Sequence, residues 1–159
     1  MNNKVIENRG TSNPELIKET EKLVNKKFPK KFIDIVSLYD RPILEKEFIE
    51  FCYNKGENRD ITSLGIIFSF DDSYPYERFV DTVNNPPEFF PEGLIAFGRD
   101  GSGNLFCFDY RQNPETDNPP IVLWLHEEEE NEGIVFLSNS FDEFIDSLKS
   151  EEEVGLGNI

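Results

Sequence analysis

Residues 94–110 read LIAFGRDGSGNLFCFDY, and this stretch decides the fold. Two runs rich in aromatic and branched residues, 94–97 and 105–108, favour β-strands. The segment between them carries the residues that permit a tight turn, namely Gly98, Gly101 and Gly103. The stretch therefore predicts a β-hairpin.

Helices are predicted at both ends of the chain. Asn13-Pro14 is a good start for a first helix over 14–27, since Asn caps free amides and Pro fits the first helical position. Its apolar face is formed by Leu16, Thr20, Leu23 and Val24. A second amphipathic helix follows Phe28-Pro29 and ends near 40–42. A closing helix begins at Ser140, where Ser-Phe-Asp-Glu forms a capping box. Lysines mixed with acidic neighbours decorate the first two helices, and we interpret them as a solvated surface: Lys18, Lys22, Lys26, Lys27, Lys30 and Lys31.

The middle of the chain favours strands. Strand-forming residues begin at Phe48 and recur over 64–70, 121–125 and 134–137, while 74–81 is typical of a short helix or turn. The order is helix, helix, strands, short helix, strands, helix. It predicts an α+β fold with a mainly antiparallel sheet and helices packed against it.

The length of 159 residues favours one domain, which we place at 1–149, followed by a flexible C-terminal tail over 150–159. The 15 Phe residues predict a core rich in phenylalanine. The N-terminus leads into no apolar signal core, and no apolar run is long enough for a membrane helix, so we expect a cytoplasmic protein. Cys52 and Cys107 form no metal or redox motif and are expected to be buried.

Acidic residues are concentrated in the second part of the chain. The net charge is −16, but residues 1–56 carry a net +2, whereas residues 57–159 carry 5 basic and 23 acidic residues, a net −18. Such a field repels phosphate backbones and anionic membranes and attracts basic partners. The charge therefore disfavours direct binding of nucleic acid or membrane, although acidity also serves solubility alone.

The sequence contains no complete catalytic, metal-binding or cofactor-binding motif. Residues 100–104 resemble the start of a calcium loop, yet the glycine and glutamate that such a loop needs are replaced by Leu105 and Arg111. The glycines lead into a strand and fit no phosphate-binding loop. His126 is the only candidate general base and has no nucleophile partner in a recognisable motif. We expect no enzyme activity, no metal and no cofactor; the alternative is a hydrolase that uses His126 with carboxylates.

The ordered elements resemble the SUKH superfamily, which includes bacterial immunity proteins and fungal regulators of cell-wall synthesis. The resemblance covers about residues 14–149. It rests on the first helix leading to Phe28-Pro29, the 94–104 strand and turn, Trp124 with His126, and the closing run 137–144. The chain departs from the family pattern at residues 39–42, where an Asn-Gly-Gly-like turn is common, and at Asn104, where an acidic residue is usual.

The resemblance implies an immunity protein that binds a polymorphic toxin, often a nuclease, and blocks it; the alternative is a non-enzymatic regulatory or scaffold module that binds a cellular protein. A nuclease presents a basic surface, which an acidic inhibitor complements. The oligomeric state stays open. The candidate contacts are acidic and tyrosine side chains in two segments: Asp71, Asp72, Tyr74, Tyr76, Glu77 and Asp81, and the run Glu127, Glu128, Glu129 and Glu130.

Overall fold

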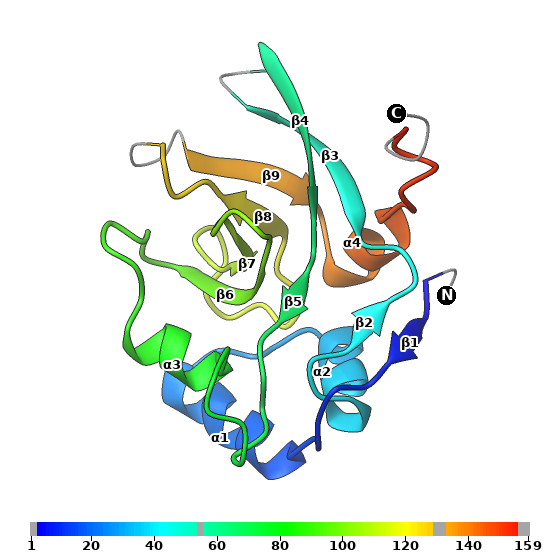
Figure 1. Cartoon of the computed structure of the whole chain (residues 1–159). Helices are drawn as coiled ribbons and strands as arrows, with labels where there is room; N and C mark the ends of the chain where they lie inside the picture. The colour runs from blue at the N-terminus through cyan, green and yellow to red at the C-terminus, as the bar shows by residue number, and fades with distance from the viewer. Residues whose placement is uncertain (1–2, 54–55, 129–132, 156–159) are drawn as a thin grey trace.

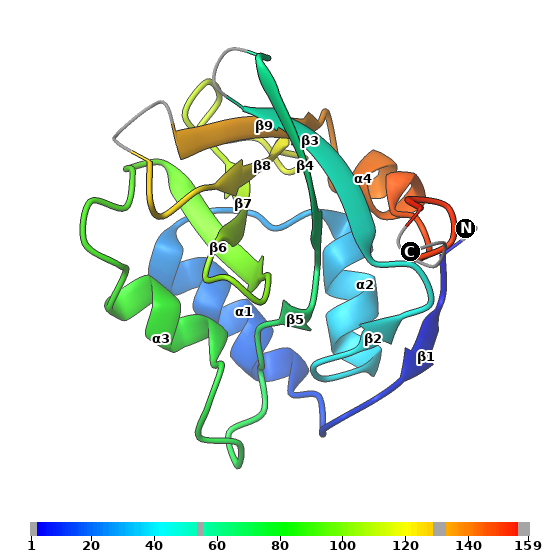
Figure 2. The same cartoon turned by 45° about the horizontal axis from the view of Figure 1, so that its top comes forward.

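A computed structural model describes residues 3–53, 56–128 and 133–155 (Figure 1). Helices α1 (Pro14–Val24) and α2 (Lys30–Leu38) lie beneath the sheet in Figure 2. Asn13 caps α1 as predicted, because its side-chain oxygen accepts the Leu16 amide at 3.3 Å. The helix ends at Val24 and not at 27, since Asn25 takes a left-handed conformation with φ 53° and its amide returns to carbonyls of the last turn.

The main sheet has five antiparallel strands in the order β5-β6-β7-β8-β9. Its central hairpin pairs β6 (Leu94–Arg99) with β7 (Leu105–Asp109), which confirms the prediction from residues 94–110. The chain continues through β8 (Ile121–Trp124), β9 (Ile134–Ser138) and the helix α4 (Phe141–Ser147). Ser140 caps α4 by accepting the Glu143 amide at 3.2 Å.

Two smaller sheets and a short helix complete the fold. β1 (Val5–Glu7) pairs with β2 (Ile43–Leu44), and β3 (Phe48–Tyr53) pairs with β4 (Asn58–Ser63), both antiparallel. The α+β, mainly antiparallel prediction is confirmed. The strand expected over 64–70 is only β5 (Ile66–Ile67). Where a short helix or turn was expected over 74–81, the helix α3 (Phe79–Asn84) begins near the end of that range.

Phenylalanine side chains fill the centre of the molecule. Phe32 of α2 is fully buried, and its ring centroid lies 5.1 Å from Phe108 of the sheet and 5.5 Å from Phe141 of α4. Phe97 stacks on Phe108 at 4.5 Å. These contacts join three elements around one core, and edge-to-face and stacked rings add to the hydrophobic stabilisation.

Two expectations about burial were wrong. Cys107 is buried as predicted, but Cys52 is exposed because it falls on the outward face of β3, whose residues alternate between core and solvent. Leu23 was expected on the buried face of α1, yet it is 55% exposed, and Ile17 and Thr20 make that contact.

The tail beyond α4 has contacts with the domain over its described residues. Glu153 pairs with Lys46 at 3.0 Å, and the Val154 side chain is largely buried. The domain boundary at 149 and the flexibility of 150–159 stay predictions. Among the described helices, none is long and apolar enough to cross a membrane.

Candidate partner-binding surface

The loop between β5 and α3 holds five of the predicted contact residues, and the sixth, Asp81, lies in α3. Asp40 holds this loop to the rest of the fold. The Asp40 side chain is only 1% exposed. Its two oxygens accept the Phe70 amide at 2.7 Å, the Ser69 hydroxyl at 2.6 Å and the Arg41 Nε at 3.0 Å. A buried carboxylate with three donors fixes the path of the loop. Asp40 has no local signal in the sequence for this role, because Ser69 and Phe70 lie far from it along the chain.

Asp71 organises the loop and is not available as a free contact. One of its oxygens accepts the Ser73 hydroxyl at 2.7 Å and the Ser73 amide at 3.0 Å, and the other accepts the Thr11 amide at 3.1 Å. The hydrogen bond from the Ser73 hydroxyl contributes most, and together these hydrogen bonds lower the pKa of Asp71 below its ordinary value. Asp71 is therefore charged at neutral pH and already satisfied within the fold.

Glu77 also forms an ion pair within the fold. Its carboxylate pairs with Arg99 of β6 through Nη2 at 2.8 Å and Nε at 3.2 Å. The hydrogen bond to Glu77 raises the pKa of Arg99 above its ordinary value. The Glu77 charge is thus neutralised locally and contributes little to a field outside the molecule.

The remaining candidates of the first predicted segment differ in exposure. Tyr74 is half-buried, because the Arg41 guanidinium lies 3.5 Å from the centre of its ring. Tyr76 packs edge-on against Tyr74 at 5.9 Å and is 68% exposed. Asp72 and Asp81 are exposed, and Asp72 accepts a hydrogen bond from Asn13 at 2.8 Å. The exposed candidates of the first segment are therefore Asp72, Tyr76 and Asp81.

The second predicted segment follows β8. Glu127 is exposed and lies 3.8 Å from His126, while Glu128 is half-exposed. Glu129 and Glu130 lie outside the described residues. Both views place the described end of this segment, residues 126–128, at the upper left and the loop between β5 and α3 at the bottom (Figures 1 and 2). The described residues of the two predicted segments therefore do not meet in one patch.

The glycine-rich turn is held by hydrogen bonds to Asp100. One Asp100 oxygen accepts the amides of Ser102 and Asn104 at 2.8 and 2.9 Å. The other accepts the Thr62 hydroxyl at 2.7 Å and the Asn104 side chain at 3.0 Å. His126 contributes to the same region, since its Nδ1 lies 2.9 Å from the Asn104 Oδ1. Residues 100–104 and His126 are thus parts of one hydrogen-bonded turn.

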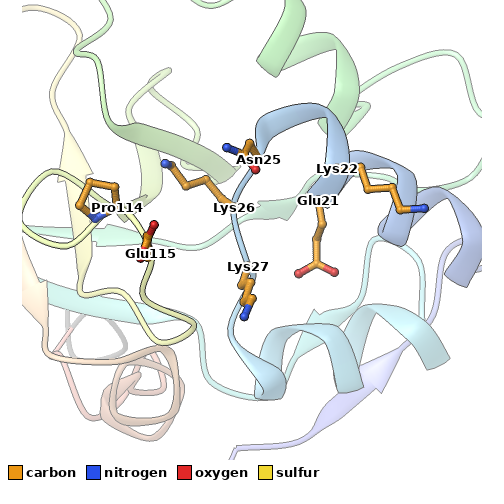
Figure 3. A pocket seen from close by; sticks show the side chains of 7 residues that line it. All are labelled: Glu21, Lys22, Asn25, Lys26, Lys27, Pro114 and Glu115. Atoms are coloured by element: carbon orange, nitrogen blue, oxygen red, sulfur yellow. The ribbon is translucent and has the colours of Figure 1, made fainter.

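A shallow pocket of about 640 Å³ lies at the end of α1 (Figure 3). Its charged side chains are of both signs, with Lys22, Lys26 and Lys27 beside Glu21 and Glu115. Glu21 accepts the Phe28 amide at 2.8 Å, and the Tyr110 hydroxyl donates to the Lys27 carbonyl. The pocket therefore belongs to the mixed helix surface expected from the sequence.

Two exposed phenylalanine residues are not among the contacts predicted from the sequence. Phe89, in the connection between α3 and β6, is 82% exposed, and Phe136 of β9 is 60% exposed. A turn could be expected from the prolines around Phe89. Its exposure could not, because each phenylalanine of the chain has the same apolar character.

The fold and surface define a small, acidic α+β domain that presents carboxylates and aromatic rings to solvent. The family model described as SMI1 / KNR4 family (SUKH-1) matches residues 11–147. The chain therefore belongs to this family, which confirms the resemblance to the SUKH superfamily. Membership supports an immunity-type or regulatory module in general. A search of curated proteins gave no match.

Proposed function

We propose that this protein is an immunity protein that binds a cognate toxin domain with a basic surface, such as a nuclease, and neutralises it in the cytoplasm. The observation that carries the proposal is the charge of residues 57–159, a net −18 on a SUKH-1 domain. A nuclease needs a basic surface to hold the phosphates of its substrate. An acidic protein that covers this surface competes directly with the nucleic acid.

The proposed mechanism is occupation of the toxin surface and not catalysis. Exposed carboxylates such as Asp72, Asp81 and Glu127 face solvent and contribute to the long-range field. Opposite fields accelerate encounter by about 10- to 1000-fold at low salt. The protein itself needs no cofactor for this role and does not bind nucleic acid or membranes directly.

The test begins with the neighbouring genes: a toxin domain encoded there is co-expressed with this protein. We expect the immunity protein to restore growth and to elute with the toxin as one complex from size-exclusion chromatography. Absence of both rescue and complex would contradict the proposal. A His126→Ala variant serves as the control for catalysis: full rescue is expected, and loss of rescue with a retained complex would favour an enzymatic role.

A regulatory or scaffold module is the second candidate, and it is supported by the same family membership. The two candidates differ in gene context and in partner. A toxin gene beside this one favours immunity. Affinity purification that recovers a cellular protein in place of a toxin, with no rescue from the neighbouring toxin, would favour the regulatory role.

A further inference from the structure

The connection between α3 and β6 exposes an aromatic side chain in a strained conformation. Phe89 has a φ of 65°, a left-handed value that is uncommon for residues other than glycine. The Phe90 amide donates to the Pro87 carbonyl at 3.1 Å, so Phe89 is the third residue of a β-turn. Turns with a positive φ at this position usually carry glycine. A bulky residue here is unfavourable for the fold by itself, and such strain concentrates at functional sites.

The turn is rigid on both sides. Pro86, Pro87 and Pro91 restrict the backbone around Phe89. At the end of the connection, the Gly93 carbonyl accepts the Tyr110 amide at 2.8 Å. A rigid turn that already presents its side chain loses little conformational entropy when it binds a partner.

Phe90 packs the turn against the sheet, whose neighbouring strand carries a second exposed aromatic residue, Phe136. The Phe90 ring packs edge-on against Trp124 of β8, with centroids 5.1 Å apart. Trp124 pairs with Ile134, and Val122 pairs with Phe136, so Trp124 and Phe136 point to the same face of the sheet. Trp124 is only 3% exposed, whereas Phe136 on the neighbouring strand is 60% exposed. The buried Trp124 thus shares its face of the sheet with the exposed Phe136 and packs against Phe90, the chain neighbour of the exposed Phe89.

The charge around these rings is acidic. Glu88 and Glu92 are exposed and flank the two phenylalanines of the turn. Glu127 lies in the segment after Trp124, and both views place this segment and the α3–β6 connection at the left of the molecule (Figures 1 and 2). Exposed aromatic anchors with a charged rim are the features of a protein-binding surface.

We infer that the surface formed by Phe89, Phe136, Glu88 and Glu92 is the main contact with the basic partner, with Phe89 inserted into an apolar depression of that partner. The inference rests on the proposed function and names its binding surface. The acidic rim selects a basic protein domain and opposes a second copy of this chain, because two copies carry −16 each. The main contact is therefore expected at the connection 85–92 and not at the predicted segment 71–81.

The test measures affinity for the toxin domain used in the co-expression test, with wild type, Phe89→Ala and Phe136→Ala. We expect Phe89→Ala to weaken binding by about 30-fold or more, as is typical of an interface anchor. The matched control is Leu23→Ala, which removes an exposed apolar side chain from α1. The control should bind within about twofold of wild type. Melting curves establish that each variant is folded.

The possible results distinguish failure of the proposed binding surface from failure of the proposed immunity function. Wild type that binds while Phe89→Ala binds equally well would overturn the surface and leave the immunity role standing. Wild type that neither binds nor rescues would overturn both. A dimer of the free protein that dissociates on Phe89→Ala substitution would identify the surface as a contact between two copies and overturn the inference.

Discussion

Replacing Asp40 by alanine should destabilise the fold strongly, because its buried carboxylate joins donors from two distant segments. The substitution leaves the Phe70 amide, the Ser69 hydroxyl and the Arg41 guanidinium without their acceptor. Breaking a buried charge pair by removing one partner typically costs about 3–5 kcal/mol. In a domain of this size each kcal/mol lowers the Tm by about 2–4 °C. The expected decrease in Tm is therefore about 6–20 °C.

Asp40→Asn should lie between wild type and Asp40→Ala. Asparagine keeps one oxygen that can accept the Phe70 amide. Its NH2 group, however, replaces the oxygen that accepts from Arg41, and an NH2 group cannot accept a hydrogen bond. Urea unfolding followed by the fluorescence of the single tryptophan, Trp124, measures the free energy of unfolding.

The control for Asp40 is another aspartate of the same region, Asp34, which is exposed on α2 and pairs with Lys30 at 3.1 Å. Asp34→Ala should change the free energy of unfolding by only about 0.5 kcal/mol, as is usual for exposed helix pairs. A free energy of unfolding for Asp40→Ala that equals that of Asp34→Ala would refute the role assigned to Asp40.

Three further predictions concern pH, thiol reactivity and strain. Burial raises the pKa of Asp109, but hydrogen bonds from Arg111 outweigh it and lower the pKa below that of the unfolded chain. Asp109 therefore stabilises the fold above about pH 4, and this contribution is lost as the pH falls through the folded value; Asp109→Asn should flatten urea-derived stability over this acid range, and an unchanged slope would contradict the prediction. Burial raises the pKa of the Cys107 thiol, so a thiol reagent should modify only Cys52 in the native protein and both after unfolding; modification of two thiols in native buffer would contradict it. Phe89→Gly relieves the positive φ and should raise the Tm by about 2–4 °C, for a gain of about 1 kcal/mol, so a lower Tm would argue against strain.

Local chemistry made much of the fold predictable. The hairpin at 94–110 combines strand-forming runs with turn glycines, and the Ser140 cap precedes an amphipathic helix, so both could be read from neighbouring residues. The strand expected over 64–70 was too long, because the Phe70 amide bonds to Asp40 and the chain leaves the sheet. That contact is made in three dimensions and has no local signal.

The candidate surface was predicted less completely than the fold. The sequence indicated acidic segments, but it could not show that Asp71 and Glu77 are held by Ser73 and Arg99. It also gave no reason to separate Phe89 from the phenylalanines of the core, since exposure depends on how the neighbouring ring packs. Charge can be counted from a sequence, whereas the availability of each charge depends on its partners in the fold.

The salt dependence of association with the toxin domain used in the co-expression test examines the proposed immunity role most directly. The association rate constant is measured by stopped flow or surface plasmon resonance from about 0.05 to about 0.5 M NaCl, a range over which the screening length falls from well above to well below about 10 Å. We predict a tight complex whose association rate constant falls about tenfold or more across this range, because opposite charges steer the encounter. No complex, or an association rate constant that is independent of salt, would contradict the proposal that the acidic surface recognises a basic toxin.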